Sequence, residues 1–195
     1  MKRRTFDVLV STVGLFLAAV LVVAGSLLTW ANHFVDHEVH TQLAAQKIFF
    51  PAKDSPAIQA PEFAAMKKYA GEQLTSGAQA ETYADHFIAN HLKEIGGGQT
   101  YAQLSAQAQA DPTNTKLAGT VETMFKGETL RGLLLNAYAF GTMGTIAGIA
   151  AICSFVAAAV MLVLGGLGLW HARRTPPTSE ILTGHATDAP TPTRV

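Results

Sequence analysis

Residues 132–170 read GLLLNAYAFGTMGTIAGIAAICSFVAAAVMLVLGGLGLW, a run of 39 residues without Asp, Glu, Lys or Arg. About 20 apolar residues in a helix cross the ~30 Å hydrocarbon core of a bilayer, and a longer uncharged run is typical of such a span. A second uncharged run covers residues 8–30. The sequence therefore predicts an all-α membrane protein: a two-span transmembrane helical hairpin with extended helices and an α-helical extracytoplasmic insert.

The composition agrees with a protein that has much of its length in lipid. Only 14% of the 195 residues are charged, against about 25% in soluble domains. The formal net charge is zero, which argues against nucleic acid as a partner, because phosphate binding requires a basic excess. The single cysteine, Cys153, lies in the second apolar run, so an internal disulfide is excluded and the thiol is expected to be a small apolar side chain.

Basic residues beside the two runs predict the topology. The positive-inside rule places Lys- and Arg-rich flanks in the cytoplasm, so both termini are expected there, in the cell membrane. The flanking residues are Lys2, Arg3, Arg4, Arg173 and Arg174. The predicted segments are a cytoplasmic N-terminus (1–7), two spans (8–30 and 146–170), an extracytoplasmic domain (31–131), an apolar extension (132–145) and a disordered cytoplasmic tail (171–195).

Two points of this topology have alternatives. The N-terminal run resembles a cleavable secretory signal, but its 23 residues exceed the usual 7–15 of a signal's apolar region, which favours an uncleaved anchor. The second run would extend roughly 58 Å as one helix, so residues 132–145 are expected to continue the helix outside the bilayer. A re-entrant or interfacial segment at 132–145 is the alternative.

The insert is expected to be helical, with no alternating strand pattern. Apolar periodicity predicts helices over residues 61–74, 76–95 and 115–125, and Gly127 is expected to break or end the last one. Thr100 and Gln103 have the spacing of a capping box at the start of a short helix that reaches about Gln109.

Small residues recur at the helical spacing of a packing face. Small side chains let helix backbones approach closely in lipid, so this face predicts contact within the hairpin or with another protein. The interaction residues predicted on this basis are Ser11, Gly14, Ala18 and Gly25 in the first run, and Ala137, Gly141, Gly144, Gly148 and Ala151 in the second. Asn136 joins them as a polar side chain in an apolar helix, which would seek a hydrogen-bond partner. Just before it, Glu128 and Arg131 are spaced to pair on a helix.

A histidine face follows the first run. His33, His37 and His40 lie at i, i+4 and i+7 and therefore share one side of an extended helix. With Asp36, and with His86 from the insert, they form a speculative site for a transition metal or a pH sensor. A solvated polar face opposite Val35 and Val39 explains the same spacing without any ligand. No cofactor is otherwise expected, and no catalytic motif is present.

Three segments, 46–51, 80–88 and 125–140, resemble parts of small, uncharacterised two-span membrane proteins of actinobacteria. The resemblance implies the same hairpin topology and brings no activity, cofactor or active site. The leading hypothesis is therefore a non-enzymatic structural or accessory membrane protein that docks to other membrane or extracytoplasmic proteins, or to itself. The alternatives are metal binding or pH sensing by the histidine face, and a small oligomeric pore or transport subunit.

Overall fold

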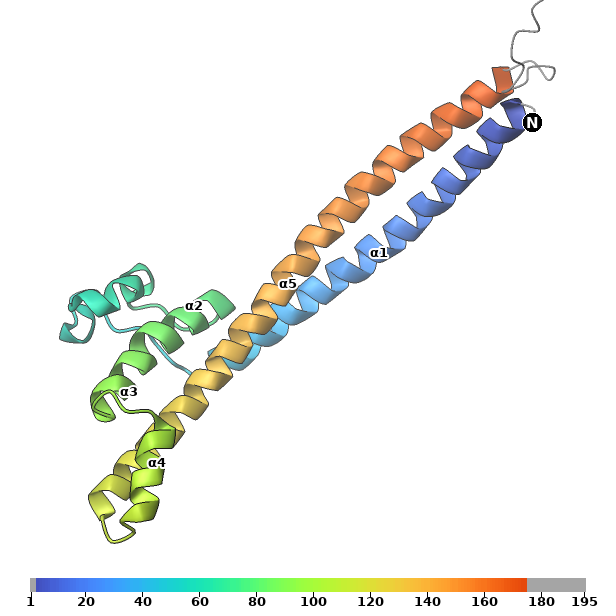
Figure 1. The fold of residues 1–195 in the computed structure, drawn as a ribbon. Helices are drawn as coiled ribbons and strands as arrows, with labels where there is room; N and C mark the ends of the chain where they lie inside the picture. Colours follow the sequence, from blue (N-terminus) through green and yellow to red (C-terminus); the bar gives the residue numbers. More distant parts are fainter. Residues whose placement is uncertain (1–2, 175–195) are drawn as a thin grey trace, which may run out of the picture. The chain divides into compact units, whose positions relative to one another are not determined.

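The computed structural model describes residues 3–174, and within them it is almost entirely helical (Figure 1). Of the predicted tail, residues 171–174 belong to the last helix, and the rest lies outside the described residues. No strand occurs among the described residues, although Phe49 and Gln73 form an isolated bridge. The elements in order are α1 (Arg3–Ala45), the 3-10 helices η1 (Pro56–Ile58) and η2 (Pro61–Tyr69), α2 (Gly77–Thr82), the π-helical segment η3 (Tyr83–Ile88), α3 (Ala89–Ile95), α4 (Tyr101–Ala110) and α5 (Thr115–Arg174).

Two helices, α1 and α5, are long and apolar enough to cross a membrane. In the most apolar stretch of each, only 17% and 11% of the residues are buried. The core helix of a soluble protein would be mostly covered, so this exposure distinguishes the pair from such helices. The chain divides into two compact units, each containing part of both helices. Among the described residues, unit 1 comprises 3–28 with 149–174, and unit 2 comprises 29–148.

Unit 1 is an antiparallel pair of helices that meet through small side chains. A Cβ built on Gly25 of α1 would lie 3.0 Å from the Phe155 ring of α5, and one built on Gly165 would lie 2.9 Å from Leu15. Bulky apolar side chains occupy the outward faces instead: Phe16, Val23, Ile152 and Val163 are all more than half exposed. Close contact through small residues, with large ones facing outward, is the arrangement expected of helices that pack in lipid.

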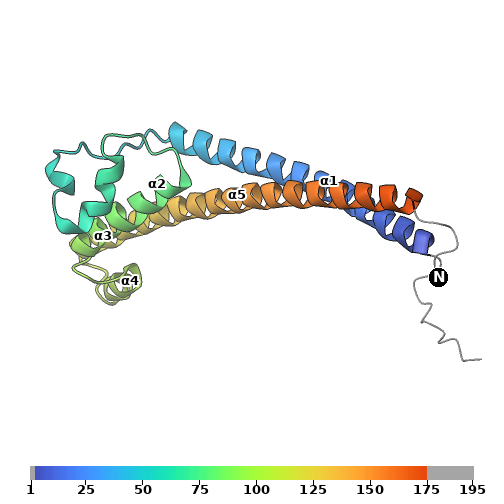
Figure 2. The same ribbon diagram turned by 90° about the horizontal axis from the view of Figure 1, so that it is seen from above.

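Unit 2 has the only extended hydrophobic core among the described residues. The insert packs against the end of α1 and the first part of α5: Leu43 of α1 and Met124 and Leu134 of α5 are buried in that core. Figures 1 and 2 both show α4 lying beside the first part of α5. The fully buried large side chains are Ile58, Met66, Leu74 and Met124.

Residues 61–74 do not form the single helix that was predicted. A 3-10 helix ends at Tyr69, and the chain then turns through Gly71, whose φ of +79° favours glycine. Residues 71–74 instead pair with 48–51: Phe50 N donates to Glu72 O, and Leu74 N donates to Ile48 O, both at 2.9 Å. These backbone bonds join segments more than twenty residues apart, so local periodicity could not indicate them.

The helix predicted over 76–95 is present as α2, η3 and α3 in succession. Ser76 and Gln79 form a capping box at its start, and Gly97 and Gly98 follow its end with positive φ. The predicted capping box of Thr100 and Gln103 is confirmed at the start of α4.

The predicted break at Gly127 is wrong, because α5 runs without interruption from Thr115 to Arg174. Gly127 lies where Leu92 of α3 packs on α5, and an added Cβ would overlap the Leu92 side chain. The glycine therefore permits a close helix contact rather than ending a helix. The same continuous helix covers residues 132–145.

Candidate functional site

The small-residue face in unit 1 is mostly a packing surface. Ala18 and Ala151 are buried, at 0% and 3% exposure, and Gly25 touches the Phe155 ring. Ser11 is buried against Gly168 of α5, where an added Cβ would overlap the serine hydroxyl. Sequence reasoning missed Gly168 and its neighbour Gly165, although their spacing to Gly148 and Ala151 carried the same signal.

Gly14 is the exception on this face. A Cβ built on it meets nothing within 4 Å beyond its own helix. It therefore borders open space between the two helices rather than a helix contact.

In unit 2 the predicted face is shared between two different neighbours. Gly144 packs on Val35 of α1, since a Cβ there would lie 3.0 Å from the valine Cγ1. Ala137 and Gly141 instead face Gly77, the first residue of α2. A Cβ on Gly77 would lie 3.1 Å from the Ala137 carbonyl oxygen. Ala137 and Gly141 thus hold the insert against α5.

Asn32 was not predicted, yet it makes the polar contact between α1 and α5 in unit 2. Its Nδ2 donates to the Gly144 carbonyl oxygen at 2.9 Å, and a Cβ built on Gly148 would lie 3.1 Å from the same Nδ2. The absence of side chains at Gly144 and Gly148 gives the amide access to the α5 backbone. The only sequence signal was a polar Asn two residues beyond the end of the apolar run at residue 30.

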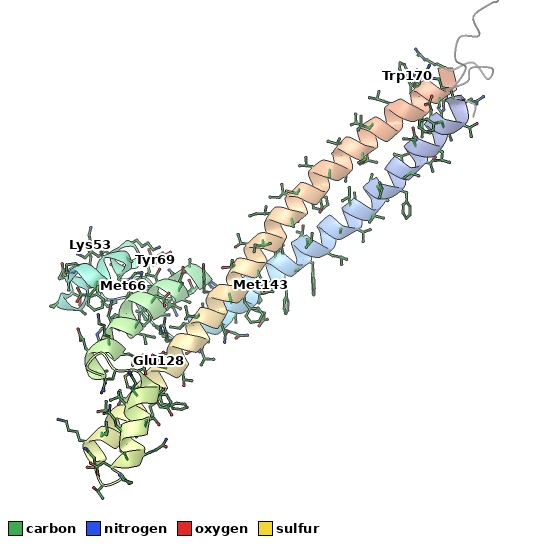
Figure 3. All side chains as sticks on the ribbon, in the orientation of Figure 1. Lys53, Met66, Tyr69, Glu128, Met143 and Trp170 are labelled. Carbon is green, nitrogen blue, oxygen red and sulfur yellow. The ribbon has the colours of Figure 1, made fainter. Side chains whose placement is uncertain are left out.

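Asn136, predicted to seek a partner, is exposed and lies on an uncovered side of α5. Large apolar residues share that side, with exposures of 56% for Phe125, 60% for Leu133, 56% for Phe140 and 61% for Met143. Their spacing of eight, seven and three residues places them along one face of the helix. We call these four residues the α5 apolar face; the labels Glu128 and Met143 in Figure 3 mark its stretch of α5.

The histidine face is solvent-exposed. His33, Asp36, His37 and His40 are all exposed on α1, and His86 lies apart from them in η3. Among residues 3–174, no group of three His, Cys, Asp or Glu side chains is placed to hold a metal ion.

Val35 and Val39 lie on the opposite side of α1. Val35 packs on Gly144, and Val39 packs against the core of unit 2. This arrangement, with histidines in solvent and valines packed inward, is that of the solvated polar face given above as the alternative to a ligand site.

Arg131 pairs with two carboxylates, of which the sequence predicted one. The distance from its Nη1 to Glu128 Oε2 is 3.6 Å, and that from its Nη2 to Asp85 Oδ1 is 2.9 Å. The hydrogen bond that Arg131 donates to the Asp85 carboxylate is the main reason that the pKa of Arg131 is raised. Asp85 lies in η3, so this pair fastens the π-helical segment to α5.

Aromatic side chains of η3 form a cluster with rings from neighbouring segments of the insert. Tyr83 contacts Phe50 edge-on, with ring centroids 5.4 Å apart, and Phe87 at 4.8 Å. Burial raises the pKa of the Tyr83 phenol, because the charged phenolate loses solvation. His91 extends the cluster, and its Nδ1 lies 2.7 Å from the Phe87 carbonyl oxygen. These contacts join η3 and α3 to the segment around Phe50 within the insert.

No protein-family model, curated protein or solved structure matches this chain.

Proposed function

We propose that this chain is an integral membrane accessory protein that docks to another membrane protein through the α5 apolar face. Both long helices are suited to a bilayer, and their apolar stretches are largely uncovered. The division between the two units, after residues 28 and 148, lies close to the span ends expected from hydropathy, at 30 and 146. This correspondence supports a membrane-embedded unit 1 and an extracytoplasmic unit 2.

The observation that supports the proposed docking is the exposure of the α5 apolar face. Leu133, Phe140 and Met143 are each more than half exposed, within a unit that buries thirteen other apolar residues in its core. Contiguous exposed apolar side chains outside a bilayer mark contact surfaces. A complementary apolar helix of a membrane protein would cover this face, and the exposed amide of Asn136 would lie within it.

The docking experiment is purification in mild detergent from the native membrane at native expression, followed by mass spectrometry of what co-purifies. Wild type is compared with a Leu133→Gln, Phe140→Gln double variant, since Gln preserves helix propensity. Phe49→Gln is the matched control, because Phe49 is equally exposed, at 56%, but lies outside α5. We expect stoichiometric larger subunits with wild type and control but not with the double variant. Recovery of wild type alone would contradict docking.

The topology has a separate test. Cys153 is the only natural cysteine, so a Cys153→Ser background accepts one engineered thiol. We expect a membrane-impermeant maleimide to label Lys53→Cys in intact cells, because Lys53 is an exposed residue of unit 2. Labelling only after the membrane is permeabilised would place unit 2 on the cytoplasmic side and refute the proposed orientation.

A further inference from the structure

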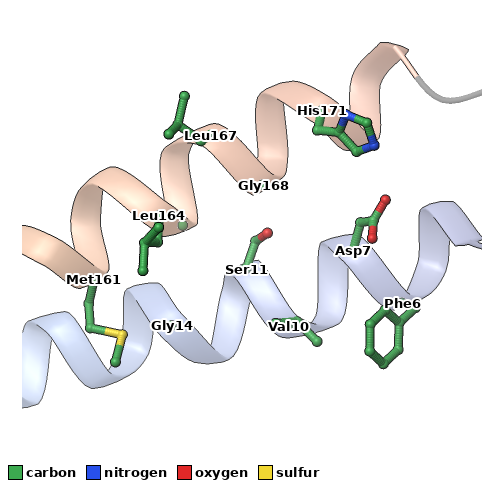
Figure 4. Close-up of a pocket in the computed structure, with 11 residues that line it drawn as sticks. Phe6, Asp7, Val10, Ser11, Gly14, Met161, Leu164, Leu167, Gly168 and His171 are labelled. Atoms are coloured by element: carbon green, nitrogen blue, oxygen red, sulfur yellow. The ribbon is translucent and has the colours of Figure 1, made fainter.

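Unit 1 contains a cavity of about 460 Å³ between the first turns of α1 and the last turns of α5 (Figure 4). Its walls are mainly apolar and include Phe6, Val10, Met161 and Leu164. Gly14 borders it, which explains why a Cβ there would meet no neighbour. The volume lies in the range of small-molecule sites, roughly 300–1,000 Å³.

Asp7 supplies a polar group at the end of this cavity. Its Oδ2 is fully buried and accepts no hydrogen bond from any residue that the structure describes. In Figure 4 the carboxylate points from α1 toward α5, where His171 lies opposite. A buried carboxylate oxygen without a donor is unfavourable, so the cavity is complementary to a ligand that carries N–H or O–H groups beside an apolar body.

The same ends of the two helices carry exposed cations. Arg3 and Arg4 precede Asp7 by one turn of α1, and Arg173 and Arg174 end α5. The Arg174 guanidinium stacks on Trp170, at 4.0 Å from the ring centroid. Positive charge around a buried negative group favours a ligand that is itself zwitterionic, with its cation inward and its anion toward the arginines.

We propose that this cavity binds a phospholipid with an ethanolamine headgroup. The primary ammonium donates to Asp7 Oδ2, the phosphate lies among the arginines, and an acyl chain runs along the apolar walls past Gly14. The inference rests on the proposed insertion of unit 1 in a membrane, which makes lipid the abundant amphiphile at this position. A choline headgroup has the same charge but no N–H, and it therefore cannot satisfy the carboxylate.

The test is native mass spectrometry of the full chain, purified from membranes and exchanged into detergent with defined lipid. We compare retention of phosphatidylethanolamine with that of phosphatidylcholine and phosphatidylglycerol of the same acyl composition. We expect selective retention of the ethanolamine lipid, and Asp7→Asn should weaken it about tenfold to a hundredfold, as for a lost hydrogen bond to a charged group. Equal retention of the ethanolamine and choline lipids, or unchanged selectivity in Asp7→Asn, would overturn the proposal.

A matched pair of glycine substitutions tests the acyl path independently. Gly14→Leu places a side chain in the cavity, whereas Gly166→Leu adds the same side chain at a position that also has no neighbour within 4 Å but does not line the cavity. We expect the first to abolish retention and the second to preserve it. Equal retention in both variants would show that the lipid lies elsewhere.

Carbonate extraction separates the two proposals. A chain that remains in the membrane pellet but shows no headgroup selectivity refutes only the lipid site. A chain released by carbonate refutes membrane insertion and the lipid site with it.

Discussion

Gly77 offers the sharpest test of how the insert is held against α5. It is the first residue of α2, and its Cα lies against the α5 backbone. A Cβ on Gly77 would lie 3.1 Å from Ala137 O and 3.2 Å from Tyr138 Cα. Both neighbours are backbone atoms, so a rotamer change cannot relieve the contact, and Gly77→Ala requires α2 to move away from α5.

The expected cost follows from two opposing effects. Overpacking a close contact costs about 1–3 kcal/mol, and the higher helix propensity of Ala offsets up to about 1 kcal/mol of this. From the middle of each range, the net loss is about 1–2 kcal/mol. For a chain of this size, such a loss lowers the Tm by about 2–8 °C.

Gly132→Ala is the matched control. It makes the same chemical change in the same unit, but it is expected to raise the free energy of unfolding rather than lower it. Gly132 lies inside α5, and a Cβ there meets nothing within 4 Å. Replacing it should raise stability by about 0.5–1 kcal/mol through backbone entropy and helix propensity alone. Whether a Gly→Ala substitution stabilises or destabilises the protein is thus determined by the atoms that lie beside the glycine.

The assay is thermal unfolding of the full chain in mild detergent, followed by circular dichroism. Amide hydrogen exchange gives a local readout, and we expect Gly77→Ala to reduce protection in α2 and its contact on α5. Two results would refute the reasoning: Gly77→Ala as stable as wild type, or Gly132→Ala destabilised to the same extent as Gly77→Ala. The first result would show that α2 does not pack closely on α5 at Gly77, and the second would show that the neighbours of a glycine do not decide whether its replacement by Ala destabilises the protein.

Three further predictions concern unit 2. Thr100→Ala removes the cap of α4 and should cost about 1 kcal/mol, measured by thermal unfolding; Thr100→Ser, which keeps the hydroxyl, should be close to wild type. The pKa of Tyr83 is raised in the folded state, so the neutral phenol stabilises the fold below about pH 10, and that stability is lost as pH rises through the raised pKa. Tyr83→Phe should therefore flatten the decline of Tm at alkaline pH. An unchanged decline in this variant would exclude Tyr83 as its source. Asp85→Asn should cost about 0.5–1 kcal/mol, because the pair with Arg131 is partly exposed, whereas Glu122→Gln in a fully exposed pair should leave Tm unchanged.

Several local features of the fold were predictable because their causes are local. The Thr100 capping box depends only on residues three apart, and the end of α3 depends on consecutive glycines with positive φ. The exposed histidines follow from helical periodicity, which places His37 on the side of α1 opposite Val35. Each prediction used interactions within about one helical turn, where sequence spacing fixes geometry.

The partners of the candidate site residues were not predictable in the same way. The stripe of small residues indicated a close contact, but not that Gly141 would face α2 while Gly144 faces α1. Arg131 pairs with Asp85 across 46 positions in the chain, and no local spacing signals that distance. Asn32 reaches the α5 backbone only because two glycines from a distant segment lie beside it.

The sequence by itself determined that the chain is helical and that two helices are long and apolar enough to cross a membrane, because these properties depend on the composition and length of one continuous segment. Tertiary structure alone decided that α5 passes through Gly127, that residues 71–74 pair with 48–51, and that the Asp7 carboxylate oxygen Oδ2 lies buried beside a cavity. The physical reason is that a glycine, a backbone donor or a carboxylate has no fixed role until its neighbours are in place. Those neighbours come from chain segments far apart in sequence, where packing, rather than periodicity, selects the contact.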